Sequence, residues 1–156
     1  MLQKVFKMST EQQITWEEYR TAVEKLCKKI VSSKTKFSVI VGLTRGGLIP
    51  AVILSHSSGI QMFAFDPHWL HSDGTARQQV QLPIDPAVTR SILVIDDISD
   101  SGKTLDKVSK FFTARGFNVE TAAVFINSKT TCHTPNYSVM DSKKQWIVFP
   151  YEKSEQ

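Results

Sequence analysis

The sequence predicts an α/β fold with a mainly parallel core sheet flanked by helices. Two observations support this prediction: strand-like segments that are apolar on both faces alternate with helical segments, and several strands end in polar or glycine-containing loops. With 41% apolar and 22% charged residues, the 156-residue chain has the composition of a single globular domain over residues 1–156. In order, the expected elements are helix 16–31, strand 37–41, helix 48–58, strand 60–65, strand 92–95, helix 104–115, strand 119–126 and short extended pieces at 137–140 and 146–149.

The three helices carry start and stop signals. Thr15 and Glu18 form the pattern of a capping box before the first helix. Pro50 suits the first turn of the second helix, and Gly59 follows its last residue. Gly116 ends the third helix in the same way.

The segment between the second and third long strands breaks this regular pattern. Residues 66–88 are mostly polar and contain Gly74 and three prolines. A loop of this length in a compact domain is usually functional or mobile. We expect it to fold over a ligand site. His68 and His71 could be read as metal ligands, but loop histidines at this spacing are more often solvated.

Charge and cysteine content narrow the class of protein. A net charge of +4, spread along the chain, indicates no nucleic-acid partner but fits a small anionic ligand. Two cysteines are too few for a disulfide framework and indicate reduced thiols in a cytoplasmic protein. No apolar run is long enough for a membrane span.

The strongest functional signal is ILVIDDISDSGKT at residues 92–104. It brings Asp96 and Asp97 to the end of a buried strand, followed by a tight turn that opens a helix. The turn residues Ser101, Gly102, Lys103 and Thr104 can direct backbone N–H groups toward one point. The positive end of the helix dipole adds to this, so the segment indicates a phosphate site.

This segment is also compatible with other interpretations. Ser101 could simply cap an ordinary helix, and the two acids could form a solvated turn. A Walker A motif is rejected because Asp97 stands where that motif needs glycine. Paired acids can bind a divalent cation or accept hydrogen bonds from vicinal hydroxyls. A ribose carrying a 5′-phosphate would therefore satisfy both halves of the motif.

Three segments of the sequence resemble a known family. Residues 92–104 resemble the phosphoribosyl-pyrophosphate (PRPP) motif of type I phosphoribosyltransferases. Residues 42–50 resemble the pyrophosphate loop of the same family, and residues 146–151 resemble the C-terminal segment of its xanthine-guanine and hypoxanthine branch. The resemblance covers about residues 14–152 and implies the family fold, with a small hood made by the N-terminal and C-terminal segments.

The resemblance implies a function and a homo-oligomer. The function is transfer of ribose 5-phosphate from PRPP to a 6-oxopurine, with Mg²⁺ as cofactor and release of pyrophosphate. PRPP and a nucleobase are the expected partners, and the assembly is a homodimer or homotetramer. Two alternatives stay open: a non-catalytic nucleotide-binding regulator on the same fold, or a transferase for another nucleobase.

On the PRPP side, the resemblance implies a role for each motif residue. Asp96 and Asp97 hold the ribose and the metal. Asp100 lies near the base as proton acceptor. The 5-phosphate binds to Asp100, Ser101, Gly102, Lys103 and Thr104, and the pyrophosphate binds to Thr44, Arg45 and Gly46. The Thr44–Arg45 peptide is expected to be cis, as it often is in the family. Taken alone, Arg45 could instead form a surface salt bridge.

On the base side, the resemblance implies stacking by Trp146, backbone contacts from Ile147, and a lysine at the 6-position of the purine. Simple alignment puts Asn127 at that lysine's position and Lys129 two residues later. We expect Lys129 to be the donor, with Asn127 as the alternative. Trp146 could also be a strand residue packed on the core.

Overall fold

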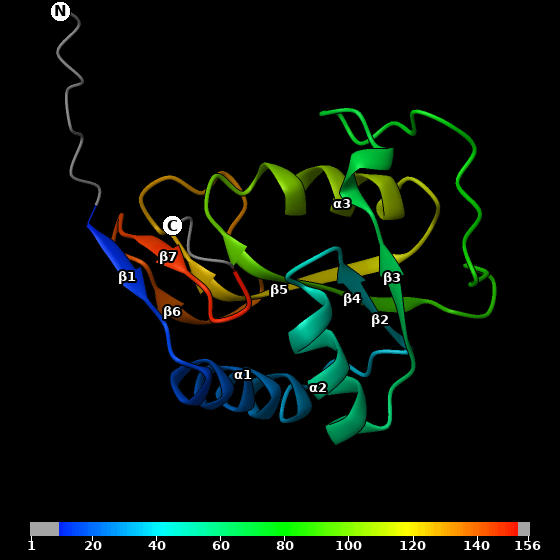
Figure 1. Cartoon of the computed structure of the whole chain (residues 1–156). Coiled ribbons are helices and arrows are strands. Elements are labelled where there is room, and N and C mark those ends of the chain that lie inside the picture. The colour runs from blue at the N-terminus through cyan, green and yellow to red at the C-terminus, as the bar shows by residue number, and fades with distance from the viewer. Residues whose placement is uncertain (1–9, 153–156) are drawn as a thin grey trace, which may run out of the picture.

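A five-stranded, entirely parallel sheet forms the centre of the computed structural model, which describes residues 10–152 (Figure 1). Its strand order is β3-β2-β4-β5-β6, and a separate parallel pair, β1 and β7, lies beside it. The strands are β1 (Glu11–Gln13), β2 (Val39–Leu43), β3 (Met62–Phe65), β4 (Ser91–Ser99), β5 (Asn118–Ile126), β6 (Tyr137–Asp141) and β7 (Trp146–Val148).

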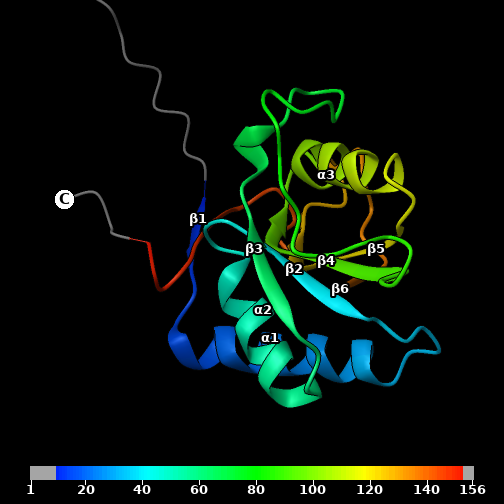
Figure 2. The same cartoon turned by 90° about the vertical axis from the view of Figure 1, so that its right-hand side faces the viewer.

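Helices cover both faces of this sheet. α1 (Trp16–Val31) and α2 (Leu48–Ser58) lie on one face, and α3 (Lys103–Thr113) lies on the other (Figures 1 and 2). Each face has its own apolar cluster, one with Leu26 and Leu54 and the other with Val108 and Phe112. Apolar residues on both faces of the strands are therefore buried, which confirms the predicted α/β fold.

The helix boundaries follow the signals in the sequence. Thr15 and Glu18 form the capping box at the start of α1. α2 ends at Gly59, whose φ of 74° lies in the left-handed region. α3 begins at Lys103, one residue earlier than expected, and ends at Thr113 rather than Arg115.

The largest difference from the expected elements is in β4. The sequence predicts a strand over residues 92–95, but β4 extends to Ser99 and includes both acids. Pairing with β2 stops at Ile95, whereas pairing with β5 continues to the Ser99–Ile126 register. The acids are therefore held by backbone pairing on one side only, which leaves the other side open.

Residues 66–88 are packed against the fold rather than free of it. They include a short 3₁₀ helix, Pro67–Trp69, and an isolated bridge between Leu70 and Ala76. Leu70 is fully buried in the cluster under α3, and Val80, Leu82 and Ile84 pack against that cluster. The segment is polar on average, but its spaced apolar residues bind it to the core.

The β1–β7 pair forms the expected hood. Phe149, just after β7, and Ile147 are buried in the cluster under α1. Both termini of the described chain therefore meet at one edge of the molecule (Figure 1). Within residues 10–152, no helix is long and apolar enough to cross a membrane.

Candidate active site

A cavity of about 1380 Å³ lies where the carboxyl ends of β2 and β4 meet the hood. This is the edge at which open parallel sheets bind ligands. Residues predicted to bind PRPP and a residue predicted to bind the base both line it. The predicted residues that line it are Thr44, Arg45, Gly46, Asp96, Asp97, Thr104 and Trp146.

The paired acids are fixed by local backbone contacts. The Asp97 N–H donates to Oδ1 of Asp96 at 2.9 Å, and the Ile98 N–H donates to Oδ1 of Asp97 at 2.7 Å. Burial raises the pKa of Asp96 well above its ordinary value, and the charge of the adjacent Asp97 raises it further. The pair thus carries electrostatic repulsion that a bound cation or hydroxyl group would relieve.

Tyr151 contacts this pair from the hood. Its hydroxyl donates to Oδ2 of Asp97 at 2.7 Å, and its ring stacks on Phe149 with the ring centroids 5.2 Å apart. Burial raises the pKa of Tyr151, as does the charge of Asp97, so the hydroxyl stays protonated and remains a donor. The hood therefore contacts the PRPP motif through a directed hydrogen bond.

The donor set of the acids fits Mg²⁺ brought by a substrate. Carboxylate oxygens are hard ligands, and Mg²⁺ is usually held by one or two carboxylates together with substrate phosphates and water. Over residues 10–152, no group of three or more His, Cys, Asp or Glu side chains could hold a metal. Asp96 and Asp97 could therefore supply part of a coordination shell, and the phosphates of a ligand would supply the rest.

The loop after β2 presents backbone and a cation to the cavity. The Thr44–Arg45 peptide is cis, as the resemblance implies. Arg45 is exposed and forms no ion pair with any described residue, so the surface salt bridge is not seen. A Cβ at Gly46 would overlap the carboxylate of Asp97, so any larger residue there would displace the Asp97 side chain.

The turn after β4 has the form of an anion site. Gly102 is the N-cap residue of α3, and its φ is 77°. It makes no side-chain hydrogen bond to the first turn of the helix. The N–H of Lys103 makes only a long contact of 3.4 Å with Oγ of Ser101, so the ordinary side-chain cap is weak. The first turns of α3 border the cavity through Thr104 and Lys107, so the positive end of a helix and a lysine lie at its wall, as an anion site requires.

The remaining predicted residues lie outside the lining of this cavity. Asp100 and Lys129 are exposed at the ends of β4 and β5. Asn127 lies between them and is only 5% exposed. Its Nδ2 donates to Oδ1 of Asp100 at 2.9 Å, and its Oδ1 accepts a 3.3 Å hydrogen bond from the Lys129 N–H. The amide of Asn127 is therefore already engaged at both ends.

The side chains of Trp146 and Ile147, both in β7, point in different directions. The Trp146 side chain is 58% exposed and lines the cavity, so it is not packed in the core. The N–H of Trp146 donates to the carbonyl of Thr10, and the carbonyl of Val148 accepts from the N–H of Ile14. The backbone groups of Trp146 and Val148 therefore face β1. Because backbone direction alternates along a strand, the N–H and C=O of Ile147 face the free edge of β7. The Ile147 side chain is buried.

Sequence reasoning missed Tyr151 and Lys107 as site residues. Lys107 follows Thr104 by three residues, so helical spacing could have placed both on one face of α3. Tyr151 lies in the segment that resembles the family, but its contact with Asp97 spans 54 positions. No local pattern shows a contact of that range.

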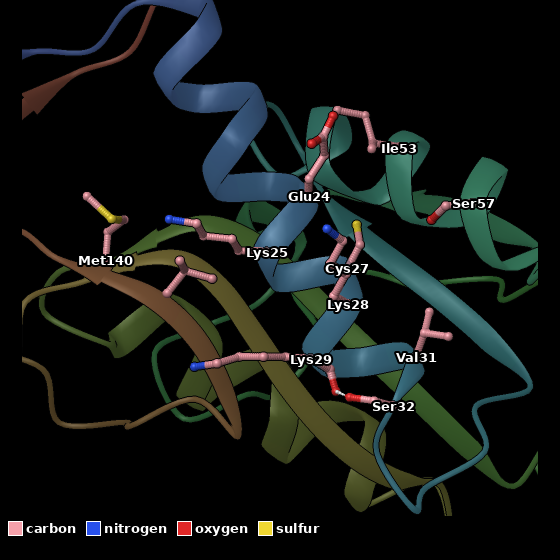
Figure 3. A pocket seen from close by; sticks show the side chains of 11 residues that line it. Glu24, Lys25, Cys27, Lys28, Lys29, Val31, Ser32, Ile53, Ser57 and Met140 are labelled. Atoms are coloured by element: carbon pink, nitrogen blue, oxygen red, sulfur yellow. Dashed lines mark hydrogen bonds between the residues drawn. The ribbon is translucent and has the colours of Figure 1, made fainter.

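A second cavity, of about 1020 Å³, lies between α1, α2 and β6 (Figure 3). Its walls are mainly apolar, with Cys27 and Ile53 among them, and lysines such as Lys25 and Lys28 lie at its border. None of the predicted site residues lines it. The predicted site residues that line a described cavity therefore all line the one at the sheet edge.

A parallel sheet with paired acids, a helix-opening phosphate turn and a hood over one cavity defines a protein of the type I phosphoribosyltransferase class. The chain belongs to that family: the model of the phosphoribosyl transferase domain matches residues 15–155. It is therefore a phosphoribosyltransferase, and this confirms the resemblance found in the sequence.

Individual relatives agree with this assignment. The chain is 25% identical over 143 residues to a xanthine-guanine phosphoribosyltransferase of Gluconobacter oxydans (strain 621H), covering 89% of this chain and 83% of that one. A solved purine phosphoribosyltransferase from Pyrococcus horikoshii Ot3 is 30% identical, with a TM-score of 0.76 and coverage of 94% and 97%. A xanthine-guanine-hypoxanthine phosphoribosyltransferase from Helicobacter pylori shares the fold at 19% identity, with a TM-score of 0.74 and coverage of 89% and 91%.

Proposed function

We propose that this protein transfers ribose 5-phosphate from PRPP to a 6-oxopurine base and releases pyrophosphate. The observation that carries the proposal is a single cavity lined both by the paired acids and by an exposed indole, Trp146. A ribose on the acids, a phosphate on the turn and a purine on the indole are the three parts of one nucleotide. The relatives, which include a purine and a xanthine-guanine phosphoribosyltransferase, support the same substrate class.

On the PRPP side, the proposed roles rest on the family resemblance and are supported by the residues that line the cavity. Residues 100–104 bind the 5-phosphate, and Thr44, Arg45 and Gly46 bind the pyrophosphate. Asp96 and Asp97 hold the ribose hydroxyls and would hold Mg²⁺, which would supply positive charge to offset that of the pyrophosphate leaving group. As pyrophosphate departs, positive charge develops at the sugar carbon, so fixed anionic and dipolar groups stabilise the transition state.

On the base side, Lys129 is the proposed donor to the 6-position, with Trp146 and the Ile147 backbone as further contacts. The alternative, Asn127, is disfavoured because its amide already bonds to Asp100 and to the Lys129 N–H. A lysine ammonium only donates hydrogen bonds, so it favours a 6-oxo over a 6-amino purine. Asp100 is the proposed proton acceptor at the base.

The proposed setting is a cytoplasmic homodimer or homotetramer. The oligomer is supported by the family resemblance. The compartment is supported by Cys27 and Cys132, which are both free thiols.

The test is a pyrophosphate-release assay with PRPP, Mg²⁺ and one nucleobase at a time. Hypoxanthine, guanine and xanthine are expected to be used with higher kcat/KM than adenine. Lys129→Ala should reduce this preference, with Lys144→Ala as the control for losing an exposed lysine outside the site. A higher kcat/KM for adenine would overturn the 6-oxopurine choice. Nucleotide binding without turnover of any base would instead identify a regulatory protein.

A further inference from the structure

The amide of Asn127 connects Asp100, at the end of β4, with the backbone of Lys129 in the loop after β5. Asn127 follows the last residue of β5 and is almost fully buried. Its Nδ2 bonds to the carboxylate of Asp100, and its Oδ1 bonds to the backbone of Lys129. A buried amide with both ends engaged cannot rotate without losing hydrogen bonds, so it is held in one orientation.

The backbone around Asn127 is fixed as well. Its N–H donates to the carbonyl of Ser99 at 3.0 Å. Its own carbonyl accepts from the N–H groups of Thr130, at 3.2 Å, and Thr131, at 3.0 Å. Both the side chain and the main chain of Asn127 are thus anchored, and it can serve as a rigid support for a neighbour.

Asp100 needs such a support because its own position is exposed. A second hydrogen bond reaches it from Oγ1 of Thr130, at 3.2 Å to Oδ1, and the same hydroxyl lies 2.9 Å from the Asp100 carbonyl oxygen. Both side-chain bonds converge on Oδ1. Within the described part of the chain, Oδ2 accepts no hydrogen bond. The carboxylate is therefore held by one oxygen and presents the other.

We propose that Asn127 is a positioning residue that fixes the Asp100 carboxylate and the start of the Lys129 loop in one arrangement. The inference rests on the proposed function, in which Asp100 accepts the proton at the base. A proton acceptor works only when its oxygen is held within hydrogen-bonding reach of the reacting atom. Asn127 supplies that constraint from a buried position and does not itself contact the base.

The main variant is Asn127→Ala, measured against Ser128→Ala. Asn127→Ala should lower kcat about tenfold, part of the 100-fold or more that a general base typically contributes. The dissociation constant of PRPP should change less than about twofold. General unfolding would instead impair both kcat and PRPP binding. Ser128 is exposed on the same loop and bonds to Asp141 instead of Asp100, so Ser128→Ala should leave kcat unchanged.

A double-mutant cycle separates positioning from a merely structural role. In an Asp100→Ala background, Asn127→Ala should cause no further loss of kcat, since its target is gone. An undiminished loss in that background would overturn the inference, as would an unchanged kcat in the single variant. If Asp100→Ala alone keeps wild-type kcat, it is the proposed role of Asp100 that fails.

Two further measurements test the inference even if Asn127→Ala cannot be assayed. Thr130→Val removes the hydroxyl contacts to Oδ1 and to the carbonyl oxygen of Asp100 from an exposed site, and should lower kcat about two- to threefold even if Asn127→Ala folds poorly. A crystal structure of Asn127→Ala, or of Asn127→Ser, should show the Asp100 side chain in a different or divided rotamer. An Asp100 carboxylate that keeps its position in that structure would contradict the inference without any assay.

Discussion

The PRPP side and the base side of the cavity are built in different ways. On the PRPP side, the acids and the phosphate turn come from residues 92–104, one unbroken strand–turn–helix segment. On the base side, the proposed contacts come from β7 and the loop after β5, which are far apart in the sequence and approach each other only through the fold, and Tyr151 connects the hood to Asp97. A contiguous site keeps its chemistry in a local pattern, whereas an assembled site depends on packing between distant segments.

The largest effect is expected on the PRPP side. Asp97→Asn keeps the shape of the side chain but removes the charge, and should lower kcat on the order of a hundredfold. The fold should be unaffected, as measured by circular dichroism and thermal melting. Glu120→Gln, in β5 at the far end of the sheet, is the control for loss of a half-buried carboxylate and should leave kcat unchanged. Wild-type turnover in Asp97→Asn would contradict the proposed role of the acid pair and, with it, the contrast between the two sides.

The next effect is expected on the base side alone. Stacking of a base on an aromatic ring is worth about 1–3 kcal/mol, so Trp146→Ala should raise the KM for the nucleobase roughly 30-fold. The KM for PRPP should not change. Trp16 is similarly exposed and does not line the cavity, so Trp16→Ala is the matched control. Equal increases in both KM values for Trp146→Ala would show that the two sides are not separate.

A smaller effect is expected at the contact between the two sides. Tyr151→Phe keeps the stacked ring and removes the hydrogen bond that orients Asp97. We expect a roughly threefold higher KM for PRPP and about 1 kcal/mol less stability, since the site is partly exposed. Tyr137→Phe removes a comparable hydrogen bond, to Glu120, away from the cavity. It should lower stability but leave the KM for PRPP unchanged.

The smallest effect concerns stability rather than turnover. The raised pKa of Asp96 means that the folded protein binds its proton more tightly than the unfolded chain does. The free energy of unfolding should therefore fall as pH rises from the ordinary value of 3.8 through the raised pKa. Without Mg²⁺ and PRPP, Asp96→Asn should melt above wild type at neutral pH. This difference should vanish below pH 3.8, where the carboxyl group is protonated in both states. A variant that melts at the wild-type temperature at neutral pH would contradict this account.

The same division explains what the sequence could predict. The capping box, the helix-ending glycines and the acid pair are local signals, and they located the helices to within two residues and the strand–turn–helix segment that carries the acids. The extension of β4 to Ser99 was missed because the charged residues mark the end of an apolar run but not the end of pairing with β5. Tyr151 and the Asn127–Asp100 bond are long-range contacts with no local pattern. The packing of residues 66–88 on the core was not predicted, because their few apolar residues are widely spaced.

The central claim is that the two sides bind the two halves of one nucleotide. The most direct measurement is a crystal structure of the protein with a 6-oxopurine nucleoside monophosphate. We predict the phosphate against the backbone N–H groups of residues 101–104, the ribose hydroxyls at Asp96 and Asp97, and the purine on Trp146. A phosphate bound elsewhere, or a base that lies away from β7 while the phosphate occupies the turn, would contradict the account.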